Sequence, residues 1–142
     1  MPEEPGGDWL LASFVGGVNM GSLEMGVTLL VHGAVVSGRL MPAREYLTRL
    51  GDDLSAAASQ AGTPEVGEQI RTQLHAVADE LYPQGAPSQE PGDEAEGPAF
   101  IHLKDVVLVP ADGRAGFRLP YWRGRVDAVD GWFFGQISPG QA

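Results

Sequence analysis

The stretch MGVTLLVHGAVVSGRL, residues 25–40, decides the fold of this 142-residue chain. Apolar side chains recur there at every second position, the period of a strand that buries one face. If His32 and Gly33 form a two-residue turn, the chain doubles back into a β-hairpin with one almost wholly apolar face. The pairs that would then lie opposite one another on that face are Val31 with Ala34, Leu29 with Val36, Val27 with Gly38, and Met25 with Leu40.

A short helix is predicted before this hairpin. Asp8 can cap its N-terminus, because a carboxylate accepts hydrogen bonds from the free N–H groups of a first turn and complements the helix dipole. Gly16 and Gly17 weaken its C-terminal end. Its apolar residues cover more than one face, so we expect a buried helix: Trp9, Leu10, Leu11, Phe14, Val15 and Val18.

Two amphipathic helices are predicted after the hairpin. The first begins at Pro42, and its apolar residues recur at spacings of three and four: Ala43, Leu47, Leu50, Leu54, Ala57 and Ala61. In the second, Thr63 is the N-cap, Pro64 is the first helical residue, and Pro83 ends the pattern. Its apolar stripe consists of Val66, Ile70, Leu74, Val77 and Leu81. We expect a helical hairpin in which each helix covers the other or the sheet.

The segment PQGAPSQEPGDEAEGP, residues 83–98, contains four acidic residues, no basic residue and nothing that can anchor a core. It is predicted to be a flexible acidic linker, either a passive connector or an electrostatic tail that tunes association. Strand patterns return at residues 99–109 and 121–126, separated by an exposed turn at 110–120, and aromatic residues follow at 132–134.

The order of these elements predicts an α+β fold. We expect a single domain over residues 8–136, with disordered ends at residues 1–7 and 137–142. Its sheet is either a small antiparallel sheet or an SH3- or Sm-like, partly open barrel. In both versions an N-terminal helix precedes the sheet and a pair of helices is inserted in it.

Charge and composition exclude several classes of function. Residues 1–98 carry 15 acidic and 4 basic side chains, which disfavours binding to the phosphates of nucleic acids. The chain has no cysteine, so disulfides, thiolate nucleophiles and cysteine-ligated zinc are excluded, as suits a reducing cytoplasm. The acidic start does not resemble a secretory signal, and the apolar stretches fall short of the ~20 residues that cross a bilayer.

No pattern of catalytic or metal-binding residues is found in the sequence. The histidines lack the spacing of a metal site, the glycines lack the Lys-Ser/Thr pair of a phosphate loop, and the serines lack a nucleophile elbow. The carboxylate pairs Asp52-Asp53 and Asp79-Glu80 lie on polar helix faces, where solvated surface charge explains them. We therefore predict a protein that is not an enzyme and uses no metal and no cofactor.

The segment YWRGRVD, residues 121–127, is the most distinctive local feature. On a strand, Tyr121, Arg123 and Arg125 face outward, while Trp122, Gly124 and Val126 face inward. Asp127 or Asp130 can pair with one of the arginines. A core tryptophan with surface ion pairs explains this pattern. The alternative is a partner-binding patch of Tyr121, Arg123 and Arg125, because arginine and aromatic residues are favoured at binding hot spots.

Four sequence blocks carry a resemblance to a known family: DWLLASFV, EMGVTLLVHGAVVSGRL, PAFIHLKDVVL and WRGRVDAVDGWFFGQ. In this order, and over about residues 8–136, they resemble the gas vesicle accessory protein U family. The positions that match its signature are Phe100, Ile101, His102, Leu103, Lys104, Trp122, Arg123, Gly124 and Arg125.

The resemblance implies a cytoplasmic protein associated with gas vesicles, acting in their assembly, stability or clustering. Its partners would be the vesicle shell, other gas vesicle proteins or a second copy of itself, through strand edges or the helical pair. The family supplies no catalytic residues to transfer. From the residues alone, a second function stays open: a small-molecule-binding or regulatory domain with a pocket between the helices and the sheet.

Overall fold

The computed structural model describes residues 8–21, 24–83 and 99–137, which form an α+β fold. In chain order the elements are α1 (Trp9–Asn19), β1 (Gly26–Val31), β2 (Ala34–Leu40), α2 (Ala43–Gln60), α3 (Pro64–Leu81), β3 (Phe100–Val109), β4 (Phe117–Arg125), a 3-10 turn (Val126–Ala128) and β5 (Gly131–Phe134). The disorder predicted for residues 1–7 and for most of 83–98 and 137–142 falls outside the described residues.

The hairpin of β1 and β2 has the predicted register. Val31 lies opposite Ala34, and Val27 lies opposite Gly38. The turn residues His32 and Gly33 both adopt positive φ angles, 50° and 86°, as the primed turns of two-residue hairpins require. The carboxylate of Asp130 accepts a 2.7 Å hydrogen bond from the backbone N–H of His32, which supports the unusual histidine at this position.

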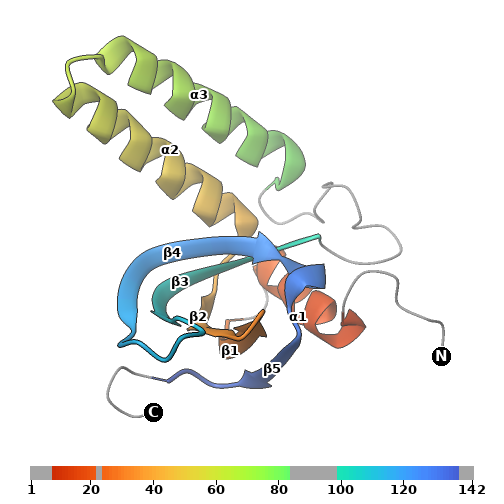
Figure 1. Cartoon of the computed structure of the whole chain (residues 1–142). Coiled ribbons are helices and arrows are strands. Elements are labelled where there is room, and N and C mark those ends of the chain that lie inside the picture. The colour runs from red at the N-terminus through yellow and green to blue at the C-terminus, as the bar shows by residue number, and fades with distance from the viewer. Residues whose placement is uncertain (1–7, 22–23, 84–98, 138–142) are drawn as a thin grey trace.

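The five strands form one antiparallel sheet in the order β4-β3-β2-β1-β5 (Figure 1). Of the two predicted versions, the open sheet is observed, because β4 and β5 are its edges and do not close it into a barrel. β5 returns to pair with β1, so the first and last parts of the fold share one core. Trp132 of β5 secures this arrangement by donating a 2.9 Å hydrogen bond to the helix cap Asp8.

One face of the sheet packs on α1 and forms the core. Asp8 caps α1 as predicted, accepting hydrogen bonds from the N–H groups of Leu10 and Leu11. The core combines residues from the helix, from three strands and from the 3-10 turn: Leu11, Val15, Val18, Val27, Leu29, Val36, Leu40, Ile101, Leu103, Val106 and Val126. The two blocks on either side of the helical pair therefore bury their apolar surface together.

A bulge in β3 changes which residues face the core. The register between β2 and β3 shifts between Ser37 and Arg39, and Asp105 of β3 has a positive φ of 52°. The neighbouring Gly38 is needed there, since a Cβ would lie 2.9 Å from the backbone oxygen of Lys104. Because of the bulge, the first half of β3 turns His102 toward the outer face of the sheet, where α2 begins.

The strand β4 is longer than predicted. It begins at Phe117, so the prediction of a turn over residues 110–120 is wrong for its last four residues. Pro120, the last residue of the predicted turn, lies inside the strand although proline has no N–H for a ladder hydrogen bond. β4 is an edge strand paired only with β3, and an edge strand tolerates the missing donor.

The helices α2 and α3 form the predicted hairpin, which projects away from the sheet (Figure 1). Thr63 holds the N-cap position of α3, although its hydroxyl donates to the carbonyl of Ala58 instead of capping the helix. The expectation that the apolar stripes would be covered is wrong for several of their residues. Leu54, Val66 and Val77 remain 39%, 50% and 38% exposed.

Small residues form the closest contacts between α2 and α3, with Leu74 as the member of the apolar stripes beside them. A Cβ on Gly67 would lie 2.7 Å from the Cβ of Ala58 and 2.9 Å from the Cα of Ser55, which shows how closely the backbones approach. Gly51 faces the backbone of Arg71 in the same way, at 3.4 Å. The larger side chains are therefore displaced from the line between the helix axes to one side of the pair.

Candidate functional site

The predicted row Tyr121, Arg123 and Arg125 lies on the outer face of β4, away from the core. In the ladder with β3, these residues pair with Lys104, His102 and Phe100 respectively. Arg123 and Arg125 are exposed, and Tyr121 is half-buried. The structure therefore brings the two signature blocks together as neighbouring strands with a shared outer face. We call the side chains of Phe100, His102, Tyr121, Arg123 and Arg125 the outer-face site.

Arg123 is held in position by two neighbours on β3. Its guanidinium carbon lies 3.9 Å from the centre of the Phe100 ring, in a cation–π contact. Its Nε donates a 3.2 Å hydrogen bond to Nε2 of His102. Within the described residues, Arg123 has no acidic partner. The arginine is thus exposed, oriented by uncharged groups, and without a counter-charge among the described residues.

His102 serves as a neutral acceptor in this arrangement. It is 2% exposed, and burial, followed by the charge of Arg123, lowers the pKa of His102 to about 3. Because Arg123 can only donate, Nε2 carries no proton and the neutral ring carries it on Nδ1. That Nδ1 is buried and has no hydrogen-bond partner in the described part of the chain. The histidine is therefore neutral near pH 7.

The side chain of Tyr121 contacts the first three turns of α2. Its ring packs edge-on against Tyr46 at 5.3 Å, and its hydroxyl donates a 2.5 Å hydrogen bond to Asp53. Burial, then the contact with Asp53, raises the pKa of Tyr121 to about 12, so the hydroxyl stays protonated. Tyr46 also stacks on His102 at 4.6 Å. The hydroxyl is therefore not available to a partner, and it joins the helical pair to the sheet.

Arg125 forms an ion pair with Asp127, one of the two acidic residues that the sequence suggested as partners of the arginines. Its Nε and Nη2 bind both carboxylate oxygens of Asp127, at 2.9 and 2.8 Å. This hydrogen bonding is the largest cause of the lowered pKa of Asp127. Asp130 instead binds the hairpin turn. Of the two arginines in the row, Arg123 thus offers the less neutralised charge.

The remaining signature residues pack in the core or connect elements of the fold. Ile101 and Leu103 are fully buried in the core, and Lys104 forms a 3.3 Å ion pair with Glu45 of α2. Trp122 packs against the core from β4. A Cβ on Gly124 would lie 2.2 Å from the far edge of the Trp122 ring, so glycine at this position makes room for the indole. These signature positions thus preserve the scaffold on which Arg123 is presented.

Residues 8–137 match the family model described as "Gas vesicle protein GvpU-like". The chain belongs to this family. The match covers the segment over which the sequence blocks indicated the resemblance, and it identifies the chain as a gas vesicle accessory protein. Searches of curated proteins and of solved structures find no match for it. No helix in the described part of this family member is long and apolar enough to cross a membrane.

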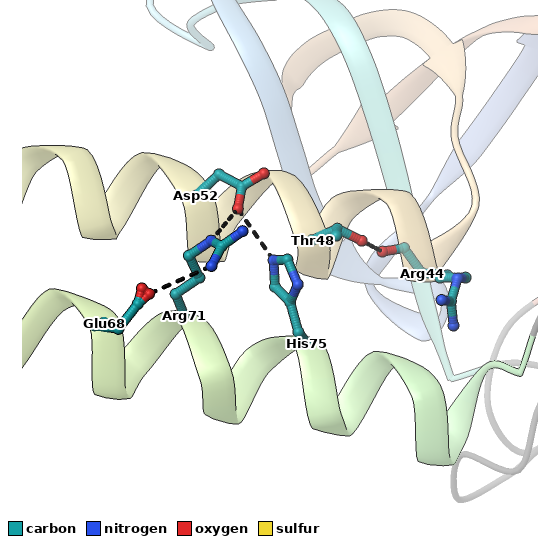
Figure 2. Close-up of polar contacts among 6 residues, drawn as sticks. All are labelled: Arg44, Thr48, Asp52, Glu68, Arg71 and His75. Carbon is teal, nitrogen blue, oxygen red and sulfur yellow. Dashed lines mark hydrogen bonds and ion pairs between the residues drawn. The ribbon is translucent and has the colours of Figure 1, made fainter.

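Three residues of the acidic pairs noted in the sequence, Asp52, Asp53 and Asp79, bind partners within the fold. Asp52 of α2 accepts hydrogen bonds from Arg71 at 2.9 Å and from His75 at 3.1 Å, both on α3, and Arg71 also binds Glu68 (Figure 2). These contacts lower the pKa of Asp52, chiefly through Arg71. The interpretation as simple solvated charge was incomplete, since Asp52 links the two helices. Among the described residues, no cluster of histidines and carboxylates could hold a metal ion.

A hollow of about 300 Å³ lies among the C-terminal ends of α1 and α3 and the start of α2. Asn19, on its lining, accepts a 2.9 Å hydrogen bond from the N–H of Ala43 and so caps α2. Its Nδ2 is buried without a partner in the described residues, but Arg44 nearby is bound to Asp79 at 2.7 Å. One unpaired donor is too little to select a ligand, so the small-molecule function gains no specific support.

Sequence reasoning did not find Tyr46 and Asp53 as parts of this region. Both lie on α2, more than sixty residues before β4, and they contact it only because the helical pair begins beside the bulge in β3. Tyr46 stands outside the apolar stripe of its helix, a weak signal that it serves another contact.

Proposed function

We propose that the chain is a non-enzymatic accessory protein of the cytoplasm that binds gas vesicles, or proteins on their surface, through the outer-face site. The proposal rests on the way Arg123 is held in the structure. Phe100 and His102 orient its guanidinium, and no acidic side chain in the described residues neutralises it. Through this contact the protein would influence vesicle assembly, stability or clustering.

The chemistry of Arg123 suits recognition of a protein partner. A guanidinium binds carboxylates with two parallel hydrogen bonds, and it loses less freedom on binding when it is already held in place. Arginine beside aromatic rings is also the composition favoured at binding hot spots. The expected counterpart is therefore a carboxylate, or a group of backbone carbonyls, on a vesicle protein.

A binding role also agrees with the contacts made by the side chains that could have served catalysis. His102 is neutral and buried, and His75 is bonded to Asp52. The hydroxyl of Tyr121 is bonded to Asp53, and Asp127 is bonded to Arg125. These polar groups support the fold and its one oriented arginine.

Co-sedimentation with purified gas vesicles tests the proposal. We expect Arg123→Ala to lower binding by a factor of about 10 or more, since truncating a hot-spot arginine typically costs at least ~2 kcal/mol. Arg114→Ala is the matched control, because Arg114 is equally charged but lies on the loop before β4, paired with Asp112. Equal binding by both variants and the unmodified chain would reject the outer-face site. Comparing intact vesicles with vesicles stripped of attached proteins then separates the shell from other proteins as partner.

A further inference from the structure

The helical pair has two chemically different sides. Each helix contacts the other through small residues, among them Gly51, Ser55 and Ala58 in α2 and Gly67 and Ala78 in α3. Successive residues of a helix are about 100° apart, so the residue before each contact residue points to one side of the pair and the residue after it points to the other. Because the two helices run antiparallel (Figure 1), this geometry places the preceding residues of both helices on the same side.

Most of the residues that precede a contact residue are apolar, although Gln73, which precedes the contact residue Leu74, is polar. The apolar ones are Leu50, Leu54, Ala57, Val66 and Val77, joined by Ile70, which precedes the contact residue Arg71. We call these six residues the apolar side. The polar side carries the contacts of Asp52 with Arg71 and His75 (Figure 2), together with the ion pair of Arg44 and Asp79.

The apolar side has no cover in the described part of the chain. The sheet contacts the first three turns of α2 through Glu45, Tyr46, Arg49 and Asp53, whose side chains do not belong to the apolar side. Its residues Leu54, Val66 and Val77 are between 38% and 50% exposed. A contiguous apolar surface of this kind on a projecting element marks an interaction site.

We propose that the apolar side is a self-association surface, on which the helical pair of a second copy packs to form a four-helix bundle. Two antiparallel helices with both apolar stripes on one side are half of such a bundle. A two-fold axis lets the same surface serve both copies, as in most protein dimers. All six residues are uncharged, so the packing would bury no unpaired charge.

The size of the surface agrees with a reversible dimer. Each helix has 18 residues, which makes it about 27 Å long. Two helices side by side are about 20 Å wide, so each copy would bury roughly 500 Å² and the pair about 1,000 Å². This total lies at the lower limit for specific interfaces. The fraction of chains in the dimer should therefore rise with protein concentration.

Self-association would give the protein a bridging geometry. The outer-face site is on the sheet, and the apolar side is on the projecting helices, so a dimer would carry two copies of Arg123 on one assembly. If the proposed vesicle binding is correct, such a dimer could link two vesicles or bind one with raised avidity. The dimer itself does not depend on that function, and it is measured with vesicles absent.

Sedimentation equilibrium of the full chain, from micromolar to near-millimolar concentration, tests the inference. We expect a concentration-dependent dimer that Leu54→Glu and Val77→Glu each weaken about 100-fold, because they place an unpaired charge in the interface. Thr72→Glu is the matched control: Thr72 is exposed on α3 but follows the contact residue Arg71 on the polar side. The helical signal in circular dichroism should stay unchanged, since all three positions are already exposed.

Two results would overturn the inference. One is a chain that stays monomeric at every concentration. The other is an oligomer that Leu54→Glu and Val77→Glu leave intact, or that Thr72→Glu weakens equally, which would place the contact elsewhere, for example on the edge strand β5. Spin labels give a second measurement, because the chain contains no native cysteine. Leu54→Cys should show intermolecular coupling that disappears on dilution with unlabelled chain, whereas a monomer that binds vesicles through Leu54 would show none in solution.

Discussion

Replacing Gly67 with alanine tests the close approach of α2 and α3. The added methyl group would lie 2.7 Å from the Cβ of Ala58 and 2.9 Å from both the Cα and the carbonyl oxygen of Ser55. Two of these three atoms belong to the backbone, so rotating a side chain cannot relieve the overlap. One helix must move away from the other.

Two opposing effects determine how much Gly67→Ala changes the free energy of unfolding. Alanine is favoured over glycine inside a helix by about 0.8–1 kcal/mol. Forcing an extra carbon into a packed contact typically costs about 1–3 kcal/mol. Because the overlap is with backbone, the upper part of that range applies, and we expect Gly67→Ala to destabilise the protein by about 1–2 kcal/mol.

Gly51→Ala is the matched control on the facing helix. Its methyl group would lie 3.3 Å from Cδ2 of His75, a side-chain atom, and 3.4 Å from its next neighbours. Small movements accommodate such contacts, so the helix preference of alanine should dominate and leave stability unchanged or raised by up to about 1 kcal/mol. The two substitutions are chemically identical, and they should have opposite effects.

Thermal and urea unfolding followed by circular dichroism measures both variants. For a chain of this length, 1 kcal/mol corresponds to a shift of roughly 3 °C in Tm. We expect Gly67→Ala to melt about 3–6 °C below the unmodified chain. If Gly67→Ala is as stable as Gly51→Ala, the helices do not approach as closely as described, and the argument that places the apolar stripes on one side fails with it.

Two further predictions concern the sheet. The folded protein keeps His102 neutral, with a pKa of about 3, whereas the unfolded chain takes up a proton near pH 6.5, so stability should fall as pH drops below 6.5. Between about pH 7 and about pH 5 this one group should remove roughly 2 kcal/mol, measured by urea unfolding. His102→Gln keeps an acceptor for Arg123 but does not titrate, so an equal pH dependence in that variant would refute the assignment. Trp122→Ala should lower stability by roughly 3 kcal/mol, because the indole packs against the core; an unchanged Tm would show that this packing contributes nothing.

Some of the candidate site could be predicted from the sequence. Alternation along one strand placed Arg123 and Arg125 outside and Trp122 inside, and the nearby Asp127 was recognised as a partner for an arginine. The difference between the two arginines was not predictable. It arises because Phe100 and His102, on another strand, hold one of them without neutralising it.

The sequence by itself determined the elements that depend on neighbours in the chain. The hairpin register follows from the alternation around His32 and Gly33, and the start of α1 follows from the cap at Asp8. The same holds for the positions of α2 and α3, whose 3.6-residue pattern is local. In these cases hydrogen bonds and apolar side chains a few residues apart decide the conformation.

Only the tertiary structure decided which surfaces remain open. The apolar stripes of α2 and α3 were visible in the sequence, but their direction depends on how closely Gly67 lets the backbones approach. The availability of Tyr121 likewise depends on Asp53, which reaches it only because the bulge at Asp105 turns the outer face of β3 toward α2. Such contacts join residues far apart in the chain, so no local pattern of residues contains them.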